Sequence, residues 1–147
     1  MKAGIDYVGL GAGAFIVNDE GKIFLTKRGE GARNQAGKWE TPGGGVEFGE
    51  TAKETVIREI KEELGVDIEI IELLCFVDDI LEEENQHWAG PTYLAKIING
   101  KPEILEPENC EEIGWYTVEE AEQMEKSVTL THDLEVYKEY LVNHKYF

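Results

Sequence analysis

The sequence has little of what several common classes of protein require. Its two cysteines, Cys75 and Cys110, are too few for a four-cysteine zinc site and do not make a disulfide framework. We expect both to be small buried residues in a reducing compartment. No apolar run approaches the roughly 18 residues of a membrane helix, and the first residues lack the long apolar stretch of a signal peptide. These absences predict a cytoplasmic protein.

Basic residues are also scarce. The 147 residues include 14 lysines and arginines against 31 aspartates and glutamates, which gives a formal net charge of −17. Such a charge repels nucleic-acid phosphates and anionic membrane surfaces, so we expect neither nucleic acid nor a membrane as a partner. The length fits one domain, residues 1–147, that is large enough to bury a core.

The pattern of apolar and polar residues predicts both strands and helices. The segments 7–17 and 22–26 flank a turn at 18–21 and predict an opening hairpin. The other predicted elements are strands at 68–80, 87–98 and 112–116 and helices at 51–64, 118–126 and 130–143. A proline and three glycines at 41–45 predict irregular structure there. Because strands and helices are interspersed, the predicted class is α/β, a mixed sheet covered by helices.

Three glycines, Gly9, Gly11 and Gly13, stand inside the first predicted strand. A dinucleotide-binding loop needs a strand before its glycines and a helix after them, and here a turn follows instead. We therefore expect these glycines to mark a place where another backbone packs closely.

The segment 51–64 carries the clearest helix signal, and it also carries a cluster of acids. Thr51 forms a capping box with the glutamate three residues later, and Gly65 is placed to end the helix. Glu59, Glu62 and Glu63 fall within one arc of about 100° on this helix. Repulsion at this spacing costs roughly 0.2–0.5 kcal/mol per pair. A hard cation such as Mg²⁺ would turn the repulsion into coordination. A solvated acidic face is the alternative.

The neighbouring residues favour the metal site. From Gly44 to Val66 the chain reads G-x5-E-x7-R-E-I-x-E-E-x-G-V. This segment resembles the Nudix box, with every defined position occupied, and residues 37–44 resemble the approach to the box in MutT-like members. The resemblance implies an α/β/α sandwich around a mixed sheet, with the Nudix box at 44–66.

The resemblance also assigns roles to five residues of the box, which form the expected catalytic group. Glu59, Glu62 and Glu63 match the metal-binding glutamates, one of which would also polarise the attacking water. Glu50 matches a glutamate beside the metal, and Arg58 matches the arginine that pairs with it and ties the loop to the helix.

Two further metal ligands are implied outside the helix. The carbonyl of Gly43 matches a backbone ligand of the MutT-like branch. A glutamate before a late strand joins the site in those relatives, and Glu111 is the best match here, with Glu112 next and a solvated surface position as the alternative. The implied cofactor is Mg²⁺, with Mn²⁺ as a substitute.

The chemistry implied is hydrolysis of a diphosphate linkage in a nucleotide. Divalent ions neutralise the phosphate charge and activate a water, and a carboxylate serves as general base. The short chain and the segment 106–115 favour a nucleoside triphosphate, cleaved to the monophosphate and pyrophosphate. ADP-ribose or another nucleoside diphosphate derivative is the alternative substrate.

Candidate substrate contacts lie before and after the box. The segment 22–38 holds five basic residues and one acid, against the overall −17. Arg28 and Arg33 in it are candidates for binding phosphate, or they balance nearby glutamates at the surface. Trp39 and His87 are candidates for contacting the rest of the nucleotide, although core packing is the expected role of a tryptophan here and a structural role that of the histidine.

Two other classes of function compete with the enzyme. A Nudix-fold module that senses a nucleotide without hydrolysing it would be expected to lack a box glutamate, and none is missing. A plain cation-binding protein would carry Asp-x-Asp-x-Asp-Gly loops, and none occurs. The apolar face of the helix 130–143 would suit either closure of the core or a homodimer contact.

Overall fold

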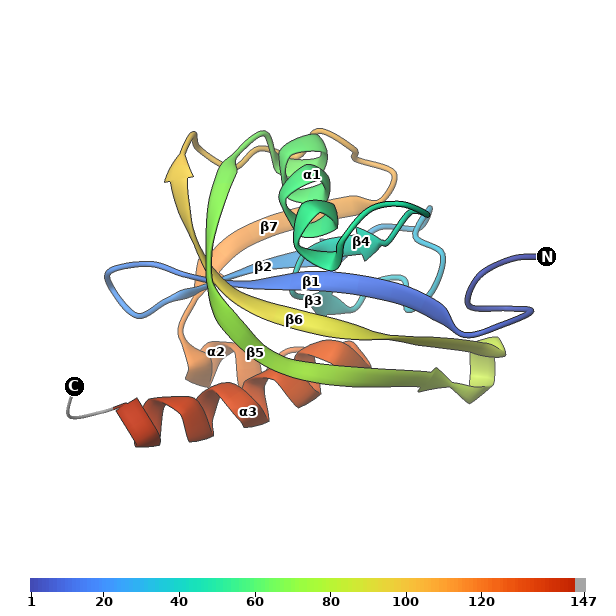
Figure 1. Cartoon of the computed structure of the whole chain (residues 1–147). Helices are drawn as coiled ribbons and strands as arrows, with labels where there is room; N and C mark the ends of the chain where they lie inside the picture. The colour runs from blue at the N-terminus through green and yellow to red at the C-terminus, as the bar shows by residue number, and fades with distance from the viewer. Residues whose placement is uncertain (145–147) are drawn as a thin grey trace.

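The computed structural model describes residues 1–144, in which a sheet lies between helices (Figure 1). The last residues of the expected domain, 145–147, lie outside the described part. The strands are β1 (Gly9–Val17), β2 (Ile23–Arg28), β3 (Trp39–Glu40), β4 (Gly43–Gly45), β5 (Asp67–Leu81), β6 (Gln86–Asn99) and β7 (Cys110–Tyr116). The helices are α1 (Ala52–Leu64), α2 (Val118–Glu122) and α3 (Val128–His144), with a 3₁₀ turn, η1 (Glu82–Glu84), between β5 and β6.

The seven strands form one mixed sheet. Its main order is β3-β2-β1-β6-β5, with β4 paired to β1 and β7 paired to β2. The β1–β6 pair is parallel and the others are antiparallel, which confirms the predicted mixed sheet. β1 and β2 pair only at Ile16–Phe24 and Val17–Ile23. The sheet therefore has two halves that meet at one end and part at the other (Figure 1).

Helices cover both faces of the sheet, as an α/β/α sandwich requires (Figure 1). Successive residues of β1 point to opposite faces, so Ile16 packs on the α1 side and Phe15 on the α3 side. The α1 side buries Val56, Ile60 and Leu64 against Ala14, Ile16 and Phe24. The α3 side buries Leu130, Leu134 and Tyr137 against Phe15, Leu25 and Leu94. The predicted fold class is confirmed.

The expectation of irregular structure at residues 41–45 was wrong in part, because β4 is a strand. It pairs antiparallel with β1, with Gly43 opposite Gly13 and Gly45 opposite Gly11. A side chain at Gly43 would collide with the backbone of β1. A run of glycines gives no alternation of apolar and polar side chains, so β4 can be recognised only from its pairing with β1. The close backbone packing expected at the three glycines of β1 is confirmed at Gly11 and Gly13, which pair with β4, whereas a side chain at Gly9 would chiefly meet the ring of Trp88.

The two C-terminal helices differ from their predicted bounds. α2 ends at Glu122 rather than 126, and α3 begins at Val128 rather than at 130. The backbone between them bonds to β3 instead: Trp39 N–H donates to the carbonyl of Glu125 at 2.8 Å, and Ser127 N–H donates to that of Trp39 at 2.9 Å. No helix within residues 1–144 is long and apolar enough to span a membrane.

Asp133 of α3 is a fully buried carboxylate in contact with β5. Its Oδ2 accepts a hydrogen bond from the Thr41 hydroxyl at 2.9 Å, and its Oδ1 accepts one from the thiol of Cys75 at 3.2 Å. Burial raises the pKa of Asp133 to about 6 and that of Cys75 to about 12. Cys75 is thus a half-buried hydrogen-bond donor, and neither it nor Cys110 forms a disulfide.

The raised pKa of Asp133 predicts a pH dependence of stability. The folded state binds this proton more tightly than the unfolded state, whose aspartate pKa is near 3.8, so the contribution falls as the pH rises through about 6. Between about pH 5 and about pH 7.5, the free energy of unfolding should fall by on the order of 1 kcal/mol more in the wild type than in Asp133→Asn. Urea unfolding at both pH values measures this. Parallel pH curves for the two proteins would contradict the assignment.

Candidate active site

Helix α1 is held at both ends by the residues that its sequence predicts. The Thr51 hydroxyl accepts the backbone N–H of Glu54 at 3.1 Å, and Gly65 ends the helix with a φ of 74°. Its apolar stripe is buried against the sheet, and the box glutamates lie beside that stripe, with Glu59 and Glu63 partly buried and Glu62 exposed. The packing of the stripe therefore fixes the direction of the glutamates.

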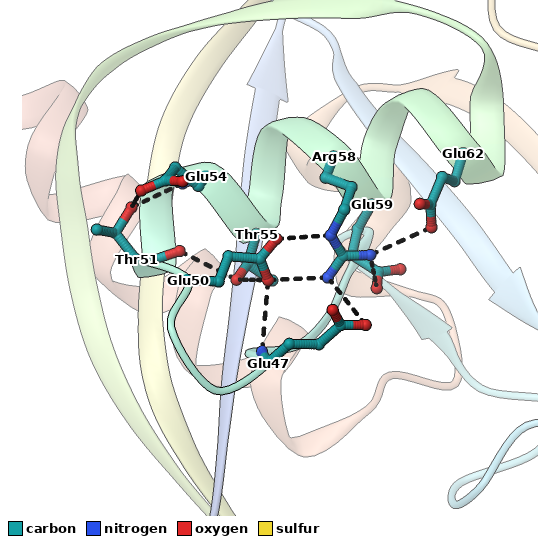
Figure 2. Close-up of polar contacts among 8 residues, drawn as sticks. All are labelled: Glu47, Glu50, Thr51, Glu54, Thr55, Arg58, Glu59 and Glu62. Carbon is teal, nitrogen blue, oxygen red and sulfur yellow. Dashed lines mark hydrogen bonds and ion pairs between the residues drawn. The ribbon is translucent and has the colours of Figure 1, made fainter.

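Arg58 is the centre of the polar network on this helix (Figure 2). Its Nε and Nη2 donate to the two carboxylate oxygens of Glu50 at 2.6 and 2.9 Å. Its Nη1 donates to Glu59 at 2.9 Å and to Glu62 at 3.2 Å. One guanidinium thus fixes the loop before the helix and orients two of the box glutamates, and its bidentate bond to Glu50 is the strong, directional kind.

Glu50 is correspondingly held in its charged form. The hydrogen bonds from Arg58, and then the one from the Thr55 hydroxyl at 2.6 Å, lower the pKa of Glu50 to about 2. The same contacts raise the pKa of Arg58 above its ordinary value. The pairing of Glu50 with Arg58, inferred from the Nudix-box resemblance, is present in the structure.

The strand β4 lies directly against the side of α1 that carries Glu59. A methyl group placed on Gly44 would lie 2.7 Å from Cγ and Oε2 of Glu59, which is closer than real contacts allow. Only glycine at this position lets the Glu59 carboxylate lie against the backbone of β4. The predicted metal ligands Gly43 and Glu59 are therefore brought to one place.

An open cavity of about 300 Å³ lies between β4, α1 and the strands of the β2 half of the sheet. This volume is within the range of small-molecule sites. Its lining includes Thr26, Arg28, Gly31, Ala32, Arg33, Glu40, Gly43, Gly44, Gly45, Glu59, Glu63, Glu106, Asn109 and Cys110. We call it the box cavity. It joins the acidic residues of α1 to two arginines of the basic segment.

Carboxylates crowd this cavity. Burial, a hydrogen bond with Glu59 and the charges of Glu59, Glu40 and Glu106 raise the pKa of Glu63 well above its usual range. Carboxylates gathered in this way suit a hard cation, because carboxylate and carbonyl oxygens are the ligands that Mg²⁺ and Mn²⁺ prefer. The chemistry of the donor set therefore fits the implied metal.

Only two of the three box glutamates line the box cavity. Glu62 has a side chain that is 52% exposed and is bonded to Arg58, and it does not line the box cavity as Glu59 and Glu63 do. Within residues 1–144, the only three metal-ligating side chains with atoms within 4.8 Å of one another are Cys75, His132 and Asp133. That group contains the protonated thiol bonded to Asp133 described above.

Glu111, the predicted outer metal ligand, is not brought to the box cavity. Its carboxylate lies 3.4 Å from the ammonium of Lys27, beside the irregular pairing of β2 with β7. Glu106 lines the cavity instead. The carbonyl of Glu106 accepts hydrogen bonds from Asn109 and Cys110, so the chain turns back at this point and β7 starts from the cavity wall. The sequence signal for this turn is Pro107 directly after the glutamate.

A family model described as the NUDIX domain matches residues 8–137. The chain belongs to the Nudix family.

Individual relatives agree with this membership. The crystal structure of a MutT NUDIX hydrolase from Burkholderia pseudomallei is 38% identical, with a TM-score of 0.79 over 88% of this chain and 98% of that one. An 8-oxo-dGTP diphosphatase of Escherichia coli (strain K12) is 45% identical over 51 residues, 35% of this chain and 39% of that protein. A nudix relative from Caenorhabditis elegans is 30% identical over 118 residues, 78% of this chain and 30% of that protein. The chain thus spans well under half the length of these two curated relatives.

Arg28, a predicted phosphate contact, lines the box cavity but is already paired with Glu40. Its Nη1 donates to both carboxylate oxygens of Glu40 at 2.7 and 2.6 Å, and its Nε donates to the carbonyl of Asn34 at 2.7 Å. Burial raises the pKa of Glu40, and the charge of Arg28 opposes that shift. In this Nudix protein Arg28 therefore compensates a buried acid, which leaves fewer donors for a ligand.

Arg33 is the more available of the two arginines. Its guanidinium lies 3.5 Å from the centre of a ring of Trp88, and the residue lines the box cavity. Burial, and then the charge of Arg28, lower its pKa. Arg33 makes no ion pair with any of residues 1–144, so its charge is available to an anionic ligand.

The two remaining predicted substrate contacts, Trp39 and His87, lie outside the box cavity. Trp39 packs edge-on against Tyr116, with ring centroids 5.3 Å apart, beside the core on the α3 side. His87 lies in a separate hollow with the N-terminal residues 4–8, and its Nε2 is 3.6 Å from a carboxylate oxygen of Asp78.

Proposed function

We propose that the chain hydrolyses a diphosphate linkage in a nucleotide with the help of Mg²⁺, and that a nucleoside triphosphate is its substrate, released as the monophosphate and pyrophosphate. The observation that carries the proposal is the box cavity, where Glu59 and Glu63 meet the glycine backbone of β4 and the guanidinium of Arg33. Membership of the Nudix family and the likeness to an 8-oxo-dGTP diphosphatase support it.

The residues present divide the work of such a reaction. Glu59, Glu62, Glu63 and the carbonyl of Gly43 would hold the metal, which supplies charge neutralisation and a water of lowered pKa. Arg58 keeps the glutamates aligned through the bonds in Figure 2.

The proton and the phosphates are handled by residues of the same cavity. A carboxylate lining it, Glu59, Glu63 or Glu106, takes the proton as the water oxygen attacks phosphorus and the bond to the leaving phosphate breaks. Arg33 neutralises the phosphates of the substrate.

A nucleotide panel with Mg²⁺ tests this function. It contains canonical and oxidised (d)NTPs, ADP-ribose, diadenosine polyphosphates and sugar nucleotides, with products separated by anion exchange. We expect pyrophosphate and a monophosphate from the triphosphates. Faster cleavage of ADP-ribose than of any triphosphate would show that the substrate is a nucleoside diphosphate derivative. If the protein binds a nucleotide but hydrolyses none of the panel, it is a nucleotide-sensing module and not an enzyme.

The role of Arg33 gives a separate prediction. Arg33→Gln should raise the KM for a nucleoside triphosphate about tenfold, because a charged hydrogen bond to phosphate is lost, with a smaller change in kcat. Lys38→Gln is the matched control: Lys38 lies in the same basic segment, outside the box cavity, with its ammonium 3.7 Å from Glu125. Steady-state kinetics measure both. Equal KM values in the two variants would remove Arg33 from the site.

A further inference from the structure

A second cavity adjoins the box cavity and shares part of its wall. It has a volume of about 100 Å³ and is lined in common with the first by Arg28, Arg33, Glu40, Gly43 and Gly44. Its other walls come from β1, β5, β6 and the start of α3. We call it the inner cavity. One ligand with phosphates beside the box glutamates could extend its remaining part into this space.

One carboxylate that lines the inner cavity, that of Asp79, has an oxygen with no hydrogen-bond partner among the described residues 1–144. Asp79 lies on β5, and its Oδ2 accepts a hydrogen bond from the hydroxyl of Thr129. Its Oδ1 is shielded from solvent and has no hydrogen-bond partner within residues 1–144. Burial raises the pKa of Asp79. A buried acceptor left without a donor is costly, so this position is suited to a donor that a ligand brings.

Three side-chain donors that line the inner cavity are committed elsewhere. Asn34 Nδ2 donates to Gln86 at 3.0 Å, and the Thr41 hydroxyl donates to Asp133. Arg28 is held by Glu40, as described above. Asp79 therefore offers the inner cavity a free acceptor, which is complementary to a ligand group that presents N–H.

Resting on the proposed function, we propose that Asp79 is a specificity-determining residue that accepts hydrogen bonds from the nucleobase and favours a guanine-type base. A carboxylate binds two adjacent N–H donors in parallel most strongly. Guanine presents a ring N–H beside an exocyclic amino group, and oxidation at its imidazole ring leaves this edge unchanged. Adenine and cytosine place a ring nitrogen lone pair there, and uracil and thymine flank their N–H with carbonyl oxygens, so each would meet the carboxylate with repulsion.

A purely structural role for Asp79 makes a different prediction. The bond from Thr129 ties β5 to α3, and loss of that tie would change hydrolysis of every nucleotide by a similar factor. A role in reading the base changes the ratio between nucleotides. The ratio of kcat/KM values is therefore the readout that separates the two.

The test compares dGTP, dITP and dATP in the wild type, Asp79→Asn and Asp78→Asn. dITP lacks the amino group of guanine, and dATP also replaces the ring N–H with an acceptor. We expect the wild type to prefer dGTP over dITP by about 10- to 100-fold, the effect of one hydrogen bond to a charged group, and over dATP by more. In Asp79→Asn, where an amide can offer N–H to the base, the dGTP to dATP ratio should fall at least about tenfold.

Asp78→Asn is the matched control. It makes the same chemical change one residue earlier on β5, where the side chain is 63% exposed, faces His87 and lies outside the inner cavity. Its nucleotide ratios should equal those of the wild type.

Each outcome decides a different point. Hydrolysis with ratios that Asp79→Asn leaves unchanged would overturn the role of Asp79 and leave the proposed function standing. Equal kcat/KM values for all three nucleotides in the wild type would do the same, even if Asp79→Asn failed to fold. No hydrolysis of any nucleotide by the wild type would overturn the proposed function and this inference with it.

Discussion

A Glu59→Gln variant is expected to hydrolyse nucleotides at least about 100-fold more slowly than the wild type at saturating Mg²⁺, which is the size of effect seen when a charge-stabilising or proton-accepting group is removed from an active site. Glutamine keeps the shape of the side chain and can still accept the bond from Arg58, which is 2.9 Å long in the wild type. It lacks the negative charge that a metal ligand or a base requires. The loss should therefore appear in kcat with the fold intact, as measured by single-substrate kinetics and circular dichroism.

Glu54→Gln is the control for this variant. Glu54 lies on the same helix, is exposed, and has a carboxylate that accepts a hydrogen bond from the Thr51 hydroxyl at 2.9 Å. It is far along the helix from the box cavity lining, so its removal should leave kcat within about twofold, because exposed substitutions of this kind change little. A folded Glu59→Gln variant that retains most of the wild-type kcat would show that this carboxylate takes no part in the reaction.

A Gly44→Ala variant is expected to lose activity to a similar degree for a steric reason. The added methyl group would lie 2.7 Å from Cγ and Oε2 of Glu59, so the carboxylate must move away from β4. A misplacement of about 1 Å at a reacting centre can cost about 100-fold in rate. Gly44 is not among the glycines with positive φ, so alanine introduces no backbone strain and the protein should fold.

Gly45→Ala provides the comparison within the same strand. A methyl group there would approach the end of the Arg33 side chain at 3.2 Å, and that side chain is flexible enough to yield. We expect a smaller loss than in Gly44→Ala, measured as kcat at saturating nucleotide and Mg²⁺. Equal losses in the two variants would mean that β4 tolerates no side chain at all and that the contact with Glu59 is not the cause.

The box helix could be predicted from the sequence because its determinants are local. A cap at Thr51, a stop at Gly65 and an apolar stripe of helical period fix which face is buried, and the acidic face follows from the same periodicity. The family resemblance then supplied the pairing of Arg58 with Glu50, and both oxygens of that carboxylate are bonded in the structure.

The glutamate outside the box helix that lines the cavity, Glu106, could not be predicted in the same way, because its position depends on the path of a long connection. Residues 100–109 join β6 to β7 without regular structure, and which glutamate faces α1 depends on where that segment turns. The turn at Glu106 places that residue in the cavity wall, whereas Glu111 follows the start of β7 and pairs with Lys27. Neither fact leaves a periodic signal in the sequence.

The position of Asp79 in the inner cavity could not be predicted from the sequence for a related reason. In the sequence it reads as one of a pair of acids before an acidic turn, with no spacing typical of a metal loop. In β5 the two neighbours point to opposite sides, so Asp78 is exposed and Asp79 enters the inner cavity. The contact that identifies it comes from Thr129, which is distant in sequence.

The central claim is that the box cavity performs metal-dependent hydrolysis of a nucleotide. Its most direct test is the release of pyrophosphate from dGTP by the metal-free purified protein as Mg²⁺ is added. We predict no release without Mg²⁺, saturable activation as it is added, and at least about 100-fold less release by Glu59→Gln at every Mg²⁺ concentration. Release that is independent of Mg²⁺, or that persists unchanged in Glu59→Gln, would contradict the claim.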